Sequence, residues 1–116
     1  MTVRLSELTK AAVRLDRGEP NHLVTRLTDD ALFRCPFVMM TEVGTIGLDE
    51  QEAEHLRTYL LKGGFLWADD YWGDYAWDYW ESMLRQALPS ATYPIVDIPR
   101  DHPLFHQVLK IGRAHV

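Results

Sequence analysis

Two short apolar runs flank the most regular helical segment of the chain, and this order constrains the fold more than any other feature. The runs are Phe37–Met40 and Gly64–Ala68, and neither contains a charged residue. Such runs are typical of strands that are covered on both faces. Because a helix separates them, the chain reads strand, helix, strand, which predicts two parallel strands joined by a right-handed crossover.

The intervening helix has clear signals at both ends. Asp49 is placed to cap its amino terminus, and Glu52 stands at the third helical position, where it completes a capping box. Leu48 and Ala53 are spaced for a hydrophobic staple. Gly63 is the residue expected to take the left-handed conformation that ends a helix.

The rest of the chain continues the alternation of helices and strands. Leu5, Leu8, Ala12 and Leu15 recur at helical spacing, and proline or glycine closes several segments. The expected elements are a helix over Arg4–Arg17, a strand over His22–Leu27, a helical turn over Ala31–Cys35, a helix over Asp74–Leu88, a strand over Tyr93–Ile98 and a helical turn after Asp101. The sum is an α/β domain with a mostly parallel sheet.

Composition limits the partners of this domain. The 116 residues carry 12 Lys and Arg against 17 Asp and Glu, a net charge of -5 without a basic stripe, so a nucleic-acid partner is not expected. The apolar runs are far shorter than the roughly 20 residues of a membrane-spanning helix. One cysteine excludes an internal disulfide. The compartment stays open, and the parent protein could be exported or associated with the cell envelope.

The last residues have no periodicity, cap or turn signal. Ile111–Val116 would be encoded by ATC GGA AGA GCA CAC GTC, which resembles a short-read sequencing adapter. We therefore expect a partial domain over residues 1–109, truncated at its carboxyl end, followed by an artefact of sequencing over residues 110–116.

The site is expected at the carboxyl ends of the strands, where ligands bind in open parallel sheets. Glu42, the pair Asp69 and Asp70, and the segment Asp97–His102 follow predicted strands. The paired aspartates could hold a divalent cation, with Glu42 or Asp101 as a further ligand. In another interpretation, one aspartate caps the next helix or turn and the other is solvated.

The aromatic residues after the second apolar run are too dense to be all buried. Trp77 and Trp80 share a helical face and are expected inside, which leaves Tyr71, Trp72 and Tyr75 for an exposed surface. Carboxylates beside exposed rings would suit a carbohydrate.

Two other candidate side chains give weaker signals. His102 and His106 are four residues apart, as metal ligands on one helix are, but Pro103 disfavours a continuous helix. Cys35 precedes Pro36 and has no histidine beside it in sequence, so we expect an inert thiol and not a nucleophile.

Motifs along the whole chain resemble a bacterial family of unassigned function, domain-of-unknown-function family 4159 (DUF4159). The motifs are Arg26–Asp29, Leu32–Phe33, Pro36–Met40, Leu48–Glu50, Leu56–Leu66, Asp69–Gly73, Pro94–Pro99 and Asp101–His106. The resemblance implies a fold similar to class I glutamine amidotransferases, which is a flavodoxin-like three-layer sandwich.

That resemblance does not carry the amidotransferase chemistry with it. Class I amidotransferases place a cysteine nucleophile on a sharp turn between strand and helix, where this chain has Asp69 and Asp70. Glutamine hydrolysis is therefore not supported, and an enzyme is the less favoured interpretation.

We expect a non-catalytic module that binds a small molecule, a glycan or a protein partner. Its binding residues would be Glu42, Asp69, Asp70, Tyr71, Trp72 and His102. The alternative is a carboxylate-dependent or metal-dependent hydrolase, in which Asp69 or Asp70 is the general base or metal ligand and His102 carries a proton. No cofactor is predicted apart from a divalent cation in this alternative.

Overall fold

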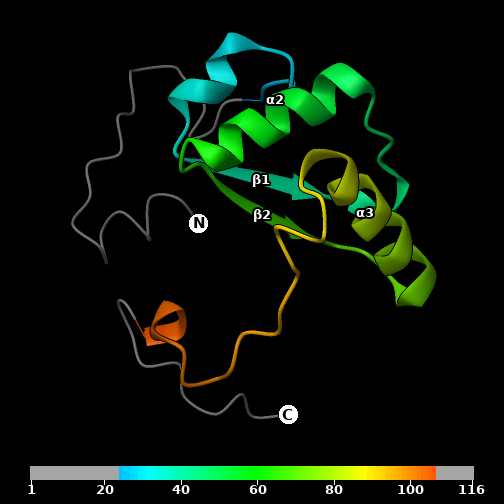
Figure 1. Ribbon diagram of the computed structural model, residues 1–116, viewed down its shortest axis with the longest axis vertical. Helices are drawn as coiled ribbons and strands as arrows, with labels where there is room; N and C mark the ends of the chain where they lie inside the picture. Colours follow the sequence, from blue (N-terminus) through cyan, green and yellow to red (C-terminus); the bar gives the residue numbers. More distant parts are fainter. Residues whose placement is uncertain (1–23, 107–116) are drawn as a thin grey trace. The chain divides into compact units, whose positions relative to one another are not determined.

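The computed structural model describes residues 24–106, which fall into two compact units (Figure 1). The first unit is Thr25–Ile95, and the described part of the second is Val24 with residues 96–106. The first contains η1 (Asp30–Arg34), β1 (Phe37–Thr41), η2 (Val43–Thr45), α2 (Glu50–Leu61), β2 (Phe65–Asp69) and α3 (Gly73–Ala87), and the second contains η3 (Pro103–His106). The helix expected over Arg4–Arg17 and the segment 110–116 lie outside the described residues.

The two strands pair in parallel, as the order of apolar runs predicts. Phe37 is the partner of Phe65 at one end of the ladder, and Thr41 is the partner of Asp69 at the other. The crossover between them contains α2. The protein is therefore a mixed α/β structure with a small two-stranded parallel sheet and two α-helices in its described part.

Both ends of α2 form as the sequence predicts. The Asp49 carboxylate accepts a hydrogen bond from the Glu52 backbone N–H at 2.8 Å, and the Glu52 carboxylate accepts one from the Asp49 N–H at 3.0 Å. Such a cap contributes about 1 kcal/mol to the stability of a helix. Gly63 follows the helix with a φ of +94°, the left-handed conformation that glycine adopts at low cost.

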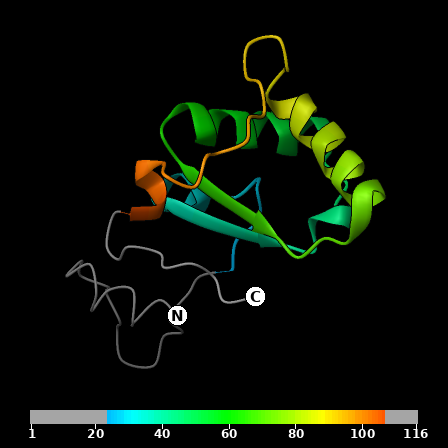
Figure 2. The ribbon, with the colours of Figure 1, turned by 90° about the horizontal axis from the view of Figure 1, so that it is seen from below.

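The hydrophobic core lies between the sheet and the helices. Figure 2 shows α2 and α3 on the same side of the two strands. The buried cluster consists of Leu32, Leu48, Leu56, Tyr59 and Ala87, and Val38 and Leu66 pack against it from the strands. This cluster is what holds the two helices over one face of the sheet.

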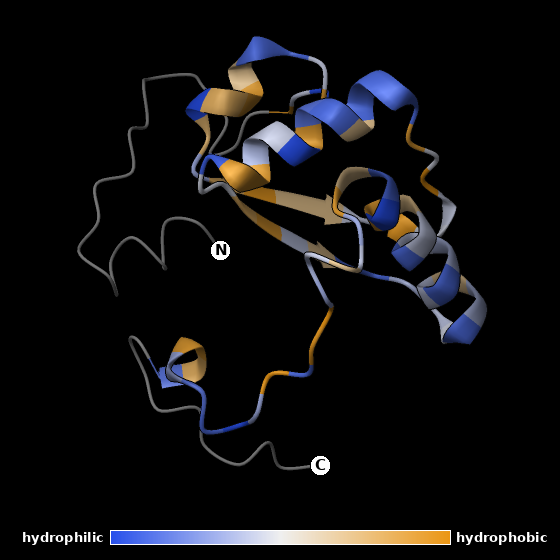
Figure 3. Ribbon diagram, in the orientation of Figure 1, coloured by the Kyte–Doolittle hydropathy of each residue, from blue (hydrophilic) through white to orange (hydrophobic). Residues whose placement is uncertain are grey.

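The opposite face of the sheet is apolar as well. Figure 3 shows hydrophobic residues along most of both strands. On this face Phe37 and Phe65 stack at 5.7 Å between ring centroids, and Met39 pairs with Trp67. These four side chains are between 43% and 52% exposed. The prediction that both strands are covered on both faces is thus wrong for the elements of Thr25–Ile95, which cover one face only.

The strand predicted over His22–Leu27 is wrong where the structure describes it. Residues 24–26 have no regular structure, and Leu27 begins a turn. The Asp29 carboxylate accepts a hydrogen bond from the Arg26 N–H at 2.9 Å, and the Asp29 N–H donates to the Arg26 carbonyl at 3.1 Å. These local bonds use the backbone groups that a strand would offer to a neighbour.

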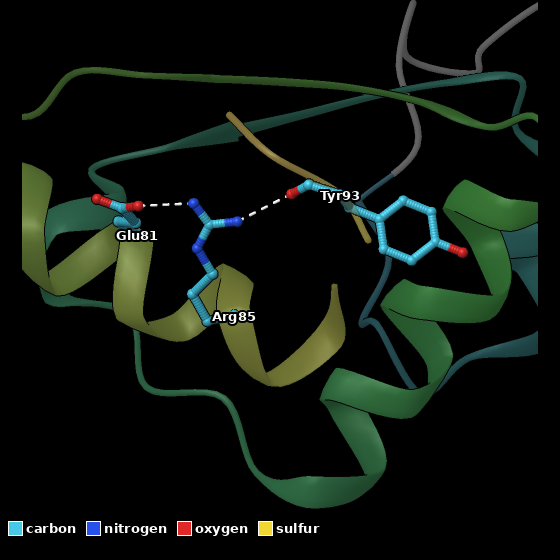
Figure 4. A network of polar contacts seen from close by, with 3 residues as sticks. All are labelled: Glu81, Arg85 and Tyr93. Carbon is cyan, nitrogen blue, oxygen red and sulfur yellow. Dashed lines mark hydrogen bonds and ion pairs between the residues drawn. The ribbon is translucent and has the colours of Figure 1, made fainter. Parts of the chain in front are cut away.

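The strand predicted over Tyr93–Ile98 is wrong as well, since the segment has no ladder in the structure. The Tyr93 N–H donates to the Pro89 carbonyl at 3.0 Å, and the Tyr93 carbonyl accepts from the Arg85 guanidinium at 2.9 Å. Figure 4 shows Arg85 between this carbonyl and Glu81, its ion-pair partner at 2.7 Å. A side chain of α3 has therefore taken the place of a strand partner at Tyr93.

The remaining elements agree with their predictions. The helical turn over Ala31–Cys35 is η1, the helix over Asp74–Leu88 is α3, and the turn after Asp101 is η3. None of the helices formed by residues 24–106 is long and apolar enough to span a bilayer.

Candidate functional site

The carboxyl ends of β1 and β2 bring three of the predicted site residues to one edge of the sheet. Because Thr41 is the ladder partner of Asp69, the next residues, Glu42 and Asp70, leave the strands at corresponding positions. Both have left-handed backbones, with φ values of 56° and 58°. Such conformations cost about 1 kcal/mol or more outside glycine and cluster at functional sites. Two such residues at corresponding positions make this edge the candidate site.

Asp69 is the most constrained carboxylate of this edge. Its Oδ2 atom accepts a hydrogen bond from the Trp67 indole N–H at 3.2 Å. Its Oδ1 atom is buried and has no hydrogen-bond partner among the described residues. Buried polar atoms are nearly always paired, so this oxygen is an acceptor in need of a donor. Asp70, by contrast, is exposed.

The aromatic residues of this region divide as the helical spacing predicts. Trp80 is buried, and Trp77 is partly buried with its ring 5.8 Å from that of Tyr71. Trp72 and Tyr75 are 87% and 83% exposed. Trp72 is the N-cap residue directly before α3 and Tyr75 is the third residue of the helix, so both rings lie at its amino terminus. Tyr71 is exposed on one side and packed against Trp77 on the other.

Gly44 lies in η2, where the chain passes close to the start of α3. The sequence analysis did not predict this contact. A Cβ on Gly44 would lie 2.7 Å from the Cβ of Ala76, which is closer than real side chains approach. The close approach of η2 to α3 therefore requires glycine here. The sequence signal was a glycine between a strand and a capped helix, which marks a connection but does not distinguish Gly44 from Gly47.

The second unit contains the two histidines. The backbone N–H of Leu104 donates to Nδ1 of His102 at 3.1 Å, and Nε2 of His106 contacts the Arg100 carbonyl at 3.1 Å. His102 precedes the short 3-10 helix η3, so the pair does not lie on one continuous helix. Thr25–Ile95 contains Glu42, Asp69–Trp72 and Tyr75, whereas His102 belongs to the other unit.

Cys35 lies before β1, at the amino edge of the sheet. Asp69 ends β2 at the opposite edge, and Asp70 follows it. The Cys35 thiol donates to the Ala31 carbonyl at 3.5 Å and is partly buried. It lines a pocket of about 240 Å³ together with Phe33, Arg34, Pro36, Tyr59, Lys62, Gly63 and Gly64. Burial raises the pKa of the Tyr59 phenol, and the hydrogen bond that this phenol donates to the Phe65 carbonyl works against that rise.

The side chains at the carboxyl edge are carboxylates and aromatic rings. Within residues 24–106, no three His, Cys, Asp or Glu side chains are grouped so as to hold a metal ion. The arrangement can accept hydrogen bonds through Glu42, Asp69 and Asp70 and can offer apolar ring surface through Trp72 and Tyr75.

These observations define a class of protein: a mixed α/β chain with a parallel strand pair and an acidic, aromatic carboxyl edge. The chain belongs to the family described as domain of unknown function (DUF4159), whose model matches residues 1–115. The family resemblance of the sequence motifs is thereby confirmed. No curated protein and no solved structure matches the chain.

Proposed function

We propose that this chain is a non-catalytic binding module that holds a small molecule, a glycan or a protein partner at the carboxyl edge of β1 and β2. The observation that carries the proposal is the exposure of Trp72 and Tyr75, since the other tryptophan rings of α3 are packed. Large aromatic rings gain about 1.5–3 kcal/mol when they are moved from water into an apolar contact. Two adjacent exposed rings are therefore a favourable place for a ligand.

The neighbouring carboxylates supply the polar part of such a site. Asp70 is exposed two residues before Trp72, and one oxygen of Asp69 has no donor among residues 24–106. Sites that bind small molecules combine apolar lining with a few polar groups that fix orientation. A sugar, which has an apolar ring face and many hydroxyl donors, suits this combination.

The absence of a thiol at this edge of Thr25–Ile95 argues against cysteine-dependent glutamine hydrolysis. The turn from β2 to α3 contains Asp70, Tyr71 and Trp72, and Cys35 precedes β1. A cysteine nucleophile needs a base within hydrogen-bond reach, and Cys35 donates to a backbone carbonyl. We also propose the finer fold, a partial flavodoxin-like sandwich similar to class I glutamine amidotransferases, on the support of the parallel pair and its crossover.

Replacing Trp72 with alanine tests the binding proposal. We expect the unmodified chain to bind at least one member of an array of immobilised glycans and peptides. Trp72→Ala is expected to weaken that binding by roughly tenfold, since a tryptophan that a ligand buries often carries much of the binding energy. Leu61→Ala is the matched control, because Leu61 is half exposed on α2 away from this edge. Binding that survives Trp72→Ala unchanged, or an array with no bound member, would contradict the proposal.

Asp69 favours a second candidate, the carboxylate-dependent hydrolase. Its Oδ1 atom has no hydrogen-bond partner in the part of the chain that the structure describes, and it is an acceptor for a proton of a water or substrate hydroxyl. The binding module is expected to show no turnover of a panel of chromogenic esters and glycosides. Turnover that Asp69→Asn abolishes, with the fold retained by circular dichroism, would decide for the hydrolase.

A further inference from the structure

The outer face of the first half of α3 has no partner in Thr25–Ile95. We name it the α3 outer surface and define it by Asp70, Trp72, Asp74, Tyr75 and Asp78, all of which are exposed. Tyr75 and Asp78 are three residues apart on α3, and Trp72 is the N-cap residue directly before it, so the two rings lie among carboxylates at the start of the helix. The two rings expose more of their surface than the other large aromatic side chains of the described residues.

The charge of this surface is of one sign. The sequence from Gly63 to Leu84 contains five carboxylates and no Lys, Arg or His. Glu81 is paired with Arg85, the one ion pair found within residues 24–106. Asp70, Asp74 and Asp78 have no cationic partner there. Asp74 and Asp78 are four residues apart on one helix, where like charges repel and destabilise the helix.

Helix stability explains only part of this pattern. Asp74 lies in the first turn of α3, where a negative charge interacts favourably with the helix dipole. The effect fades beyond the first turn, so it does not account for Asp78, and Asp70 precedes the helix. Helix stability also does not explain why the rings of Trp72 and Tyr75 remain in water near these carboxylates.

We propose that the α3 outer surface docks a segment of a partner protein that carries arginine or lysine. The proposal rests on the binding-module function and names the partner of that site. A guanidinium or ammonium group stacks on Trp72 or Tyr75 through a cation–π interaction and forms charge-assisted hydrogen bonds with the flanking aspartates. A neutral sugar would contact the rings without relieving the repulsion among the carboxylates. An anionic segment would add to that repulsion.

The test uses the full chain and fluorescein-labelled peptides in which arginine alternates with glycine. The matched probe replaces every arginine with citrulline, which keeps the size and removes the charge. Measured by fluorescence anisotropy, the arginine peptide is expected to bind at least about tenfold more tightly than the citrulline peptide, and added salt is expected to weaken it. Equal binding of the two peptides would overturn the proposal.

Two sets of variants locate the binding. The triple variant Asp70→Asn/Asp74→Asn/Asp78→Asn is expected to weaken binding of the arginine peptide by roughly tenfold. Trp72→Ala is expected to weaken it by roughly fivefold. The control Asp30→Asn/Glu50→Gln/Glu54→Gln removes the same charge from other exposed carboxylates of Thr25–Ile95 and is expected to leave binding unchanged. A control that loses as much affinity as the first triple variant would show non-specific attraction and overturn the proposal.

The outcomes also separate this inference from the function on which it rests. If a glycan binds in a Trp72-dependent way and the arginine peptide does not bind, the binding module stands and the cationic partner is wrong. If neither glycan nor peptide binding depends on Trp72, both proposals fail. All substituted residues are exposed, and circular dichroism melting of each variant verifies that the fold is retained.

Discussion

Replacing Leu56 with alanine is expected to lower the free energy of unfolding by about 3 kcal/mol. Leu56 is 1% exposed and belongs to the cluster that joins α2 to the sheet and α3. The substitution removes three buried carbon atoms and leaves a cavity, because Tyr59 and Leu32 can collapse into the space only in part. Since a domain of this size is stable by about 5–15 kcal/mol, the loss is a large share of the total. Urea unfolding followed by circular dichroism measures it.

Leu61→Ala is the matched control for this prediction. Leu61 is in the last turn of the same helix, and its side chain is 51% exposed. The same chemical change there is expected to cost less than about 1 kcal/mol, because much of the removed surface is already in water. If both variants lose the same stability, Leu56 is not in the core and the packing of α2 on the sheet is wrong.

The elements that sequence predicts best are those with local signals. The Asp49–Glu52 capping box and Gly63 set the ends of α2 through bonds and dihedral angles within a few residues. The two apolar runs are separated by this helix, and the parallel pairing follows from that order. β1 extends one residue beyond its prediction, to Thr41, and β2 is shifted by one residue, to Phe65–Asp69.

The two wrong strands show what local patterns leave out. The segment over Tyr93–Ile98 has the valine and isoleucine content of a strand, but a strand forms only when a neighbour accepts its hydrogen bonds. The Tyr93 carbonyl is instead held by Arg85, a residue eight positions earlier on α3. In the stretch before Leu27, the Asp29 side chain binds the backbone of Arg26 and favours a turn.

The candidate site was predictable in its position and not in its conformation. Parallel strands that end together place Glu42 beside Asp70, and helical spacing separates the exposed rings from Trp80. The left-handed backbones of Glu42 and Asp70 are not encoded by residue type, since glycine is the usual residue there. His102 was predicted at the same edge from a strand that does not form, so the reasoning that placed it there no longer holds.

Replacing Gly64 with alanine is expected to lower the free energy of unfolding by about 1–3 kcal/mol, the usual cost of inserting a group into a packed site. A Cβ at Gly64 would lie 2.4 Å from Cζ of Tyr59 and within 2.6 Å of both Cε atoms. The ring cannot easily turn aside, because Tyr59 is 3% exposed and its hydroxyl donates to the Phe65 carbonyl at 3.3 Å. Thermal unfolding followed by circular dichroism measures the loss.

Gly47→Ala is the control for the Gly64 substitution, since a Cβ there would meet only the Tyr79 hydroxyl at an ordinary distance of 3.7 Å. It is expected to change stability by less than about 1 kcal/mol. The clash itself is isolated by a double-mutant cycle with Tyr59→Leu, which removes the ring atoms that the new methyl group would meet. Gly64→Ala should then cost much less in the Tyr59→Leu background than in the unmodified chain. An equal cost in both backgrounds would mean that the ring of Tyr59 does not lie over Gly64, and the packing of the end of α2 against the start of β2 would have to be redrawn.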